Sequence, residues 1–208
     1  MMSDIQALIF DFGNVLCKWT PPTSSSIDHK KMKQIMTSDV WCDYERGGYA
    51  SEYECYKVLE ERFAIKSEDF ASAMAEARQS LRVETALLEF LTALREHYSS
   101  LRLFGLSNTP YPEEDAVQSI GRQWPIFDHI YTSGTLRMRK PDISCYKHVL
   151  KEIGLSAEEV LFIDDSLENV LAARSVGINS ILFQNHKQVS CLIKDALNGT
   201  ALDDANLL

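Results

Sequence analysis

Five short apolar runs, separated by segments with helical periodicity, constrain the fold of this chain more than any other feature. The runs cover residues 7–12, 101–106, 129–132, 160–163 and 180–183. Residues 7–12, ALIFDF, and residues 160–163, VLFI, are apolar on both faces, which is typical of buried parallel strands. Helical patterns occupy residues 84–98, 143–153 and 166–176. Strands that alternate with helices predict an α/β fold with a doubly wound, mainly parallel, Rossmann-like sheet.

Residues 28–80 interrupt this alternation, because they contain helical runs and no clear strand. A chain of 208 residues buries roughly 70% of its extended surface, which is enough for one core with a small inserted lobe. We therefore predict an α/β core domain of residues 1–17 and 82–208, with a helical cap domain of residues 18–81 inserted after the first strand.

Polar and charged side chains that could bind a ligand or react lie at or near the C-terminal ends of the predicted strands. They are Asp11, Ser107, Asn108, Asp164 and Asp165, with Lys140 just ahead of the 143–153 helix. Ligands of open α/β sheets bind at this edge, so we expect these residues to lie together. Taken alone, each has a simpler explanation, such as a turn, a solvated lysine or an acid near a helix N-terminus. Two adjacent carboxylates at a buried strand end nevertheless require a cation or strong donors nearby.

Four sequence motifs occur in one order along the chain: ALIFDFGNVL, LFGLSNT, MRKPDISCY and LFIDDSLENV. Together they resemble the haloacid dehalogenase (HAD) superfamily of phosphohydrolases, and the resemblance covers nearly the whole chain. The motifs are most similar to those of glucose-1-phosphatase-like proteins and of the phosphatase domain of soluble epoxide hydrolase. The inserted helices match the small helical cap of this family.

The resemblance implies an Mg²⁺-dependent phosphatase that acts on a small organic phosphate through an aspartyl-phosphate on Asp11. The implied metal ligands are Asp11, Asp165 and the Gly13 carbonyl, with Asp164 acting through metal-bound water or holding Lys140. The implied phosphate-binding residues are Ser107, Asn108, Lys140, Gly13 and Asn14. Asn169 stands where the family often has a helper Asp or Asn. Hard oxygen ligands suit Mg²⁺, and a carboxylate nucleophile suits this chemistry.

Gly13 departs from the family pattern, because most phosphatases of the family carry a second Asp there as general acid and base. Such help is worth about 10²–10⁴ in rate. One interpretation is a phosphatase whose substrate is a good leaving group, such as a glycosyl 1-phosphate or a diphosphate. The second is a metal-independent haloacid dehalogenase, although FGNV lacks the Tyr-Gly-Thr typical of those enzymes. The third is a catalytically impaired binding or regulatory protein.

Two further features bear on the substrate. The sequence DDSLE at residues 164–168 also matches the DDxxE metal motif of terpene synthases, so prenyl monophosphates and diphosphates belong among the compounds to test. In the cap, aromatic residues cluster around Gly47 and Gly48, where they either pack the helices or bring a loop into the site. Arg46 in that cluster is a candidate substrate contact. Trp19 either lines the mouth of the site or anchors the linker.

The composition limits the partners. With 21 Lys and Arg against 30 Asp and Glu, the net charge is −9, which disfavours a nucleic-acid partner. No apolar run approaches the ~20 residues that span a bilayer, and Asp4 argues against a signal peptide. Five widely spaced cysteines without a CxxC motif favour reduced thiols. We therefore expect a cytoplasmic monomer or homodimer that acts on a small phosphorylated metabolite, away from nucleic acid and membrane.

Overall fold

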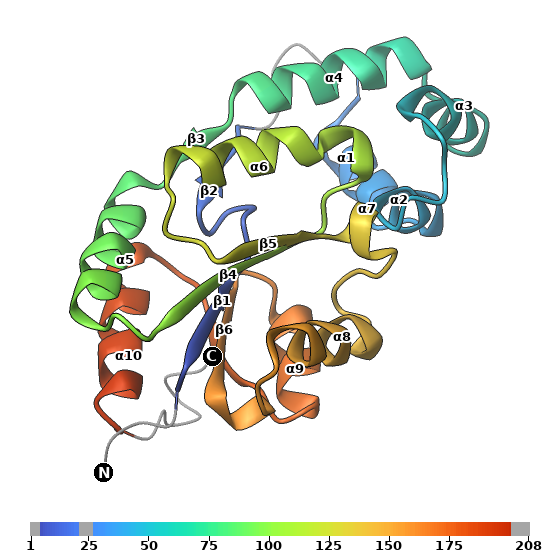
Figure 1. Ribbon diagram of the computed structural model, residues 1–208. Helices are drawn as coiled ribbons and strands as arrows, with labels where there is room; N and C mark the ends of the chain where they lie inside the picture. Colours follow the sequence, from blue (N-terminus) through green and yellow to red (C-terminus); the bar gives the residue numbers. More distant parts are fainter. Residues whose placement is uncertain (1–4, 21–26, 201–208) are drawn as a thin grey trace.

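A five-stranded parallel sheet with the strand order β5-β4-β1-β6-β7 forms the centre of the protein (Figure 1). The structure is a computed structural model that describes residues 5–20 and 27–200. Its strands are β1 (Ala7–Phe10), β4 (Arg102–Ser107), β5 (His129–Thr132), β6 (Val160–Asp164) and β7 (Asn179–Leu182). Each overlaps one of the five apolar runs, and the predicted α/β sheet is confirmed. Residues 1–4, including Asp4, lie outside this description.

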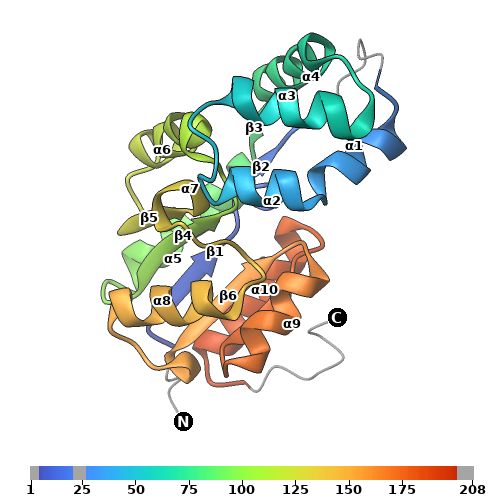
Figure 2. The same cartoon turned by 90° about the vertical axis from the view of Figure 1, so that its right-hand side faces the viewer.

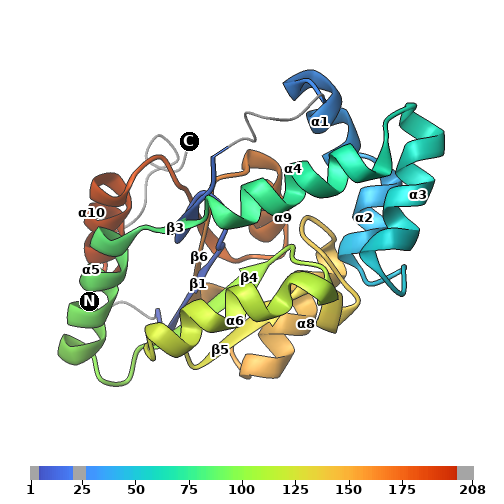
Figure 3. The same cartoon turned by 90° about the horizontal axis from the view of Figure 1, so that it is seen from above.

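Helices cover both faces of the sheet (Figures 1 and 3). One layer contains α5 (Thr85–His97), α6 (Glu114–Gln123) and α10 (His186–Leu197), and the other contains α8 (Ile143–Ile153) and α9 (Leu167–Ser175). The side chains of β1 alternate between them, because Leu8 and Phe10 pack into the first layer, whereas Ala7 and Ile9 pack into the second. The sequence patterns predict α5, α8 and α9, whereas α6 and α10 were not predicted. In the described part of the chain, no helix is long and apolar enough to cross a bilayer.

Four helices form a separate lobe above the sheet (Figure 2). They are α1 (His29–Met36), α2 (Asp39–Glu45), α3 (Glu52–Phe63) and α4 (Ser67–Gln79). The first three begin at side-chain N-caps, where Asp28, Ser38 and Ser51 accept bonds from main-chain amides. Trp41 and Tyr44 are buried in the lobe's own apolar cluster, so these aromatic residues pack the helices together. All four helices lie within the predicted cap range of 18–81.

A short antiparallel ladder closes the base of the cap. It pairs β2 (Cys17–Lys18) with β3 (Arg82–Val83), so that Cys17 lies opposite Val83. The chain therefore leaves and re-enters the core at neighbouring points. The ladder falls at both predicted domain boundaries, and the boundaries themselves stay a prediction. The core is completed by the one-turn helix α7 (Ser133–Leu136) and the 3₁₀ turns η1 (Tyr111–Glu113) and η2 (Ala157–Glu159).

Candidate active site

The C-terminal ends of β1, β4 and β6 meet around one buried lysine. Lys140 is 1% exposed, and its Nζ donates to Asp11 Oδ1 at 2.8 Å and to Asp164 Oδ2 at 2.6 Å. Asp11 follows β1 directly, and Asp164 is the last residue of β6. The sequence expectation that these three side chains lie together is therefore correct. Because the lysine has two carboxylate partners in a dry site, its pKa is raised despite its burial.

A set of donors fixes Asp164 in place. Its Oδ1 accepts from the Ser166 amide at 2.8 Å, and the Asn169 Nδ2 donates to Oδ1 at 3.0 Å and to Oδ2 at 3.1 Å. Tyr146 in turn donates its hydroxyl to the Asn169 carbonyl at 3.0 Å. Of the two roles left open for Asp164, its contacts match the one that holds Lys140. Asn169 lies beside Asp164, in the position of a supporting residue.

Asn108 clamps the main chain that carries Lys140. Its Nδ2 donates to the Lys140 carbonyl at 2.8 Å, and its Oδ1 accepts from the Lys140 amide at 2.9 Å. A phosphoryl contact from Asn108 would therefore use its main-chain amide. Next to it, Ser107 and Thr109 share a hydroxyl–hydroxyl hydrogen bond of 2.8 Å. The end of β4 thus supplies two features to the same site: the buried Ser107 hydroxyl, and the Asn108 side chain that holds the main chain of Lys140.

Three carboxylates gather in the site. Asp11, Asp164 and Asp165 each offer an oxygen, and these oxygens lie within 4.8 Å of one another. Burial raises the pKa of Asp11 to about 7, Asp164 and Asp165 add to the rise, and Lys140 opposes it. Asn14, at a φ of 58° that Asn tolerates, donates its Nδ2 to Asp165 Oδ2 at 3.0 Å.

This donor set fits a hard divalent cation. Mg²⁺ prefers oxygen ligands and commonly uses one or two carboxylates. A bound cation would also remove the repulsion that the clustered acids exert on Asp11. Glu168 is exposed on α9 and does not belong to this carboxylate group, so only the two aspartates of the DDSLE run lie in it.

Magnesium is expected to stabilise the fold. A ligand that binds only the native state at 100 times its Kd adds about 2.7 kcal/mol, or roughly 5–10 °C in Tm for a chain of this size. Thermal unfolding with Mg²⁺ and with EDTA measures this shift. Asp165→Asn should remove most of it, whereas Asp115→Asn, at an exposed ion pair with Arg122, should keep it. An equal rise in Tm with Mg²⁺ in the wild type and in both variants would contradict a metal site at these carboxylates.

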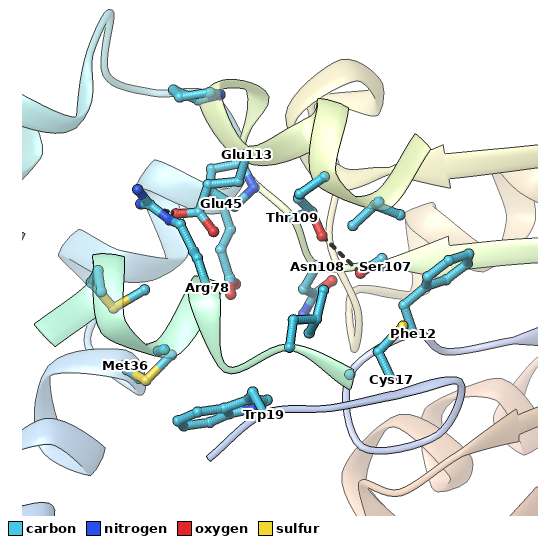
Figure 4. Close-up of a pocket in the computed structure, with 18 of the residues that line it drawn as sticks. Phe12, Cys17, Trp19, Met36, Glu45, Arg78, Ser107, Asn108, Thr109 and Glu113 are labelled. Atoms are coloured by element: carbon cyan, nitrogen blue, oxygen red, sulfur yellow. Dashed lines mark hydrogen bonds and ion pairs between the residues drawn. The ribbon is translucent and has the colours of Figure 1, made fainter. Parts of the chain in front are cut away.

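An apolar cavity of about 320 Å³ opens between the cap and the core (Figure 4). Its apolar lining comes from α1, α2, α4, α6 and the segments that follow β1 and β2, and includes Phe12, Trp19, Met32, Met36, Trp41, Met74, Ala77, Val117 and Ile120. Gly13, Ser107 and Asn108 line the same cavity, so it extends to the loop after β1 and to the end of β4, next to the residues that carry the carboxylate site. Of the two roles weighed for Trp19, its place in this lining favours the mouth of the site.

Core packing fixes one wall of this cavity. Gly105 of β4 leaves room for the Phe12 ring, with which a Cβ there would clash. A larger residue at this strand position would therefore displace the aromatic wall beside the nucleophile. This close approach explains a glycine inside a strand, where it otherwise weakens the sheet.

The segment 137–142 joins the cap to the site. Arg139 Nε donates to Glu45 Oε2 at 2.7 Å, and Arg46 Nη2 donates to Asp142 Oδ2 at 2.8 Å. Arg137 Nη1 donates to the Gly47 carbonyl at 2.6 Å. The structure therefore corrects the expectation for Arg46, which does not line the cavity and instead ties α2 to the core. The turn at Gly47 contacts the core without entering the cavity.

A second contact between cap and core lies at the far side of the cavity from Phe12 and Cys17 (Figure 4). Arg78 Nη2 of α4 donates to Glu113 Oε1 at 2.9 Å, and also contacts Glu52. Sequence reasoning did not single out Arg78, Glu113 or Arg139. Arg139 is adjacent to Lys140, and Glu113 is six residues after Ser107, so their closeness to the motifs could have marked these two residues. No feature of the sequence marks Arg78.

The chain matches the family model described as haloacid dehalogenase-like hydrolase over residues 5–177. A sesquiterpene phosphatase (astK) of Aspergillus oryzae is 33% identical over 178 residues, which cover 86% of this chain and 89% of that protein. The drimenol cyclase drtB of Aspergillus calidoustus is 39% identical over 186 residues, which cover 89% of this chain. The match spans 35% of the cyclase, so this chain corresponds to about a third of that relative.

Solved structures share the fold. A HAD-family enzyme of Bacteroides thetaiotaomicron in a magnesium complex superposes with a TM-score of 0.70 at 23% identity, covering 92% of this chain and 99% of that one. The same enzyme in complex with magnesium and inorganic phosphate gives a TM-score of 0.66 at 23% identity, covering 86% of this chain and 94% of that one. These likenesses show that the chain shares the fold of that enzyme.

Proposed function

Because the chain belongs to the haloacid dehalogenase-like hydrolase family and is an enzyme of the phosphatase type, we propose that it removes phosphate from the ester of an apolar alcohol, with terpenoid alcohols as the substrate class. The observation that carries this proposal is the apolar cavity, which reaches from the cap to Gly13 and Ser107 beside the nucleophile. Its volume of about 320 Å³ lies in the range of small-molecule pockets. The likeness to a sesquiterpene phosphatase supports the same class.

The proposed reaction begins at Asp11. One of its carboxylate oxygens attacks phosphorus, the bond from phosphorus to the alcohol oxygen breaks, and the leaving alkoxide takes a proton from solvent. Water then attacks the aspartyl-phosphate, which releases inorganic phosphate and restores the carboxylate. Lys140, the Ser107 hydroxyl and the Asn108 main-chain amide face the phosphoryl oxygens and offset their charge in a site with little water.

Asp11, Asp165 and the Gly13 carbonyl are the proposed Mg²⁺ ligands, with Asp164 holding Lys140. When bound, the cation would supply Lewis-acid neutralisation of the phosphoryl charge. Asn14 orients Asp165 through its hydrogen bond. The clustered carboxylates favour this assignment over the dehalogenase interpretation, since a halide-releasing site has no use for a cation. We keep a monomer or homodimer as the predicted assembly.

Phosphate release from a substrate panel tests the proposal. The panel contains farnesyl phosphate, geranyl phosphate, glucose 1-phosphate and a nucleoside monophosphate, each with Mg²⁺ and with EDTA. We expect a kcat/KM at least about tenfold higher for the terpenoid esters, since burial of apolar carbons in a matching pocket is worth this much. A preference for the sugar or the nucleotide would overturn the substrate class. Phosphate binding without any release would instead support a binding protein.

Filling the cavity should penalise long substrates selectively. Ala77 of α4 lines the cavity and Ala75 is exposed on the same helix, so Ala77→Leu adds bulk to the pocket, whereas Ala75→Leu adds it to solvent. We expect Ala77→Leu to raise the KM for farnesyl phosphate about tenfold and to leave that for p-nitrophenyl phosphate within about twofold. Steady-state kinetics of both variants measure this. A similar loss for both substrates would argue against a terpenoid chain in this cavity.

A further inference from the structure

All nine glycines of the chain lie in the described residues, and eight have either a positive φ or a close neighbour in the direction of a Cβ. Four have a positive φ, which strains any side chain: Gly47, Gly154, Gly177 and Gly199. At four others an added Cβ would approach a neighbouring atom to 2.8 Å or less: Gly48, Gly105, Gly121 and Gly134. Gly13 has neither property, because its φ is not positive and an added Cβ would meet nothing within 4 Å.

Gly13 is also part of the cavity lining. It shares this lining with Phe12, Cys17 and Ser107, and it stands two residues after the nucleophile Asp11. Backbone geometry and packing would therefore both accept a side chain at this position. Neither the fold nor the close packing of the core therefore requires the space at this position to stay empty.

We propose that Gly13 is a specificity-determining residue that leaves room for a branched or ring-containing carbon skeleton next to the ester oxygen. This inference rests on the proposed function and deepens it. The first carbons of the alcohol are held within a few bonds of phosphorus, so space beside Asp11 selects their shape. Space at Ala77, on the cap side of the cavity, selects the length of the chain. The two positions therefore control different properties of the substrate.

Glycine at this position also leaves the site without a general acid there. It offers no proton to the leaving alkoxide, and an acid at this position would fill the space that the carbon skeleton needs. Gly13→Asp should therefore shift the enzyme toward small, unbranched esters with poor leaving groups, and away from bulky ones. Gly13→Ala adds bulk alone and keeps the main-chain carbonyl, so it separates the steric effect from the acid.

Calorimetric binding tests the steric part without turnover. With Mg²⁺ present, the dissociation constants of tert-butylphosphonate and methylphosphonate are measured for the wild type and for Gly13→Ala. We expect the ratio of the two constants to move at least about tenfold against the branched ligand, because overpacking a defined space is costly. Thermal unfolding should show an unchanged or slightly higher Tm for Gly13→Ala, since glycine-to-alanine changes at unstrained sites stabilise.

Two outcomes separate this inference from the proposed function. An unchanged ratio of dissociation constants in Gly13→Ala, or a marked fall in Tm, would overturn the role of Gly13 whatever the substrate is. If the ratio moves as expected in Gly13→Ala but the wild type hydrolyses no terpenoid ester, the substrate class would be overturned and the role of Gly13 kept. In kinetics, the ratio of kcat/KM for a bicyclic terpenyl phosphate over ethyl phosphate should fall at least about tenfold in Gly13→Ala and further in Gly13→Asp.

Discussion

Asp11→Asn is expected to lower phosphate release by about 10⁴-fold or more, the scale seen when a covalent nucleophile is removed. The amide keeps the shape of the side chain but is a far weaker nucleophile, so the aspartyl-phosphate cannot form. The substitution should not unfold the protein, because burial already raises the pKa of this carboxyl to about 7 and Lys140 retains Asp164. A discontinuous assay of inorganic phosphate with the preferred substrate, beside thermal unfolding, measures both quantities.

Asp115→Asn is the matched control, because this exposed carboxylate on α6 pairs with Arg122 away from the site. It should retain full activity. If Asp11→Asn retained more than about a hundredth of wild-type turnover while folded, the covalent route would be wrong, and Asp11 would act only by charge.

Lys140→Met is expected to affect both stability and rate. Methionine is of similar length and apolar, so it leaves Asp11 and Asp164 buried without their cation. Removing one partner of a buried ion pair costs about 3–5 kcal/mol, and loss of a charged donor at the phosphoryl group costs about 10²–10³ in kcat. Lys147→Met, at an exposed position on α8, is the control and should change neither quantity.

The stability loss in Lys140→Met should depend on pH. The folded-state pKa of Asp11 is raised above its ordinary value of 3.8 to about 7, so Asp11 favours folding most at low pH and this contribution is lost as the pH rises toward 7. Removing Lys140 raises the pKa of Asp11 further, which enlarges that loss. Urea unfolding with EDTA should therefore show a larger deficit at pH 8 than at pH 5. A deficit that does not change with pH would mean that packing, and not charge, is the role of Lys140.

The core of this protein could be predicted because its signals are local. Apolar runs such as residues 160–163 define strands, and the polar residues that follow them must meet at one edge once the strands are parallel. The ladder of β2 and β3 was missed because strands of two residues carry no periodicity. The helices α6 and α10 were not singled out, although α6 carries Ile120 of the cavity wall.

The contacts between cap and core could not be predicted because they join distant parts of the chain. Glu45 and Arg139 are 94 residues apart, and Arg78 and Glu113 are 35 apart. Charged residues of this kind are ordinary on a helical surface, so nothing in the sequence marks the ones that pair. Arg46 illustrates the limit, since its place beside a glycine pair suggested a substrate contact, whereas the fold gives it Asp142.

The ladder of β2 and β3 makes the cap easy to exchange, but only together with a segment of the core. Because Cys17 and Val83 face each other, a foreign cap inserted between them closes the same short distance. The part of the foreign cap that replaces α2 and the turn after it would then meet Arg137, Arg139 and Asp142. In this protein these three residues contact Gly47, Glu45 and Arg46, and they lie in the segment that carries Lys140. The unit that evolution or recombination must transfer to move a substrate preference between relatives is therefore the cap together with residues 137–142.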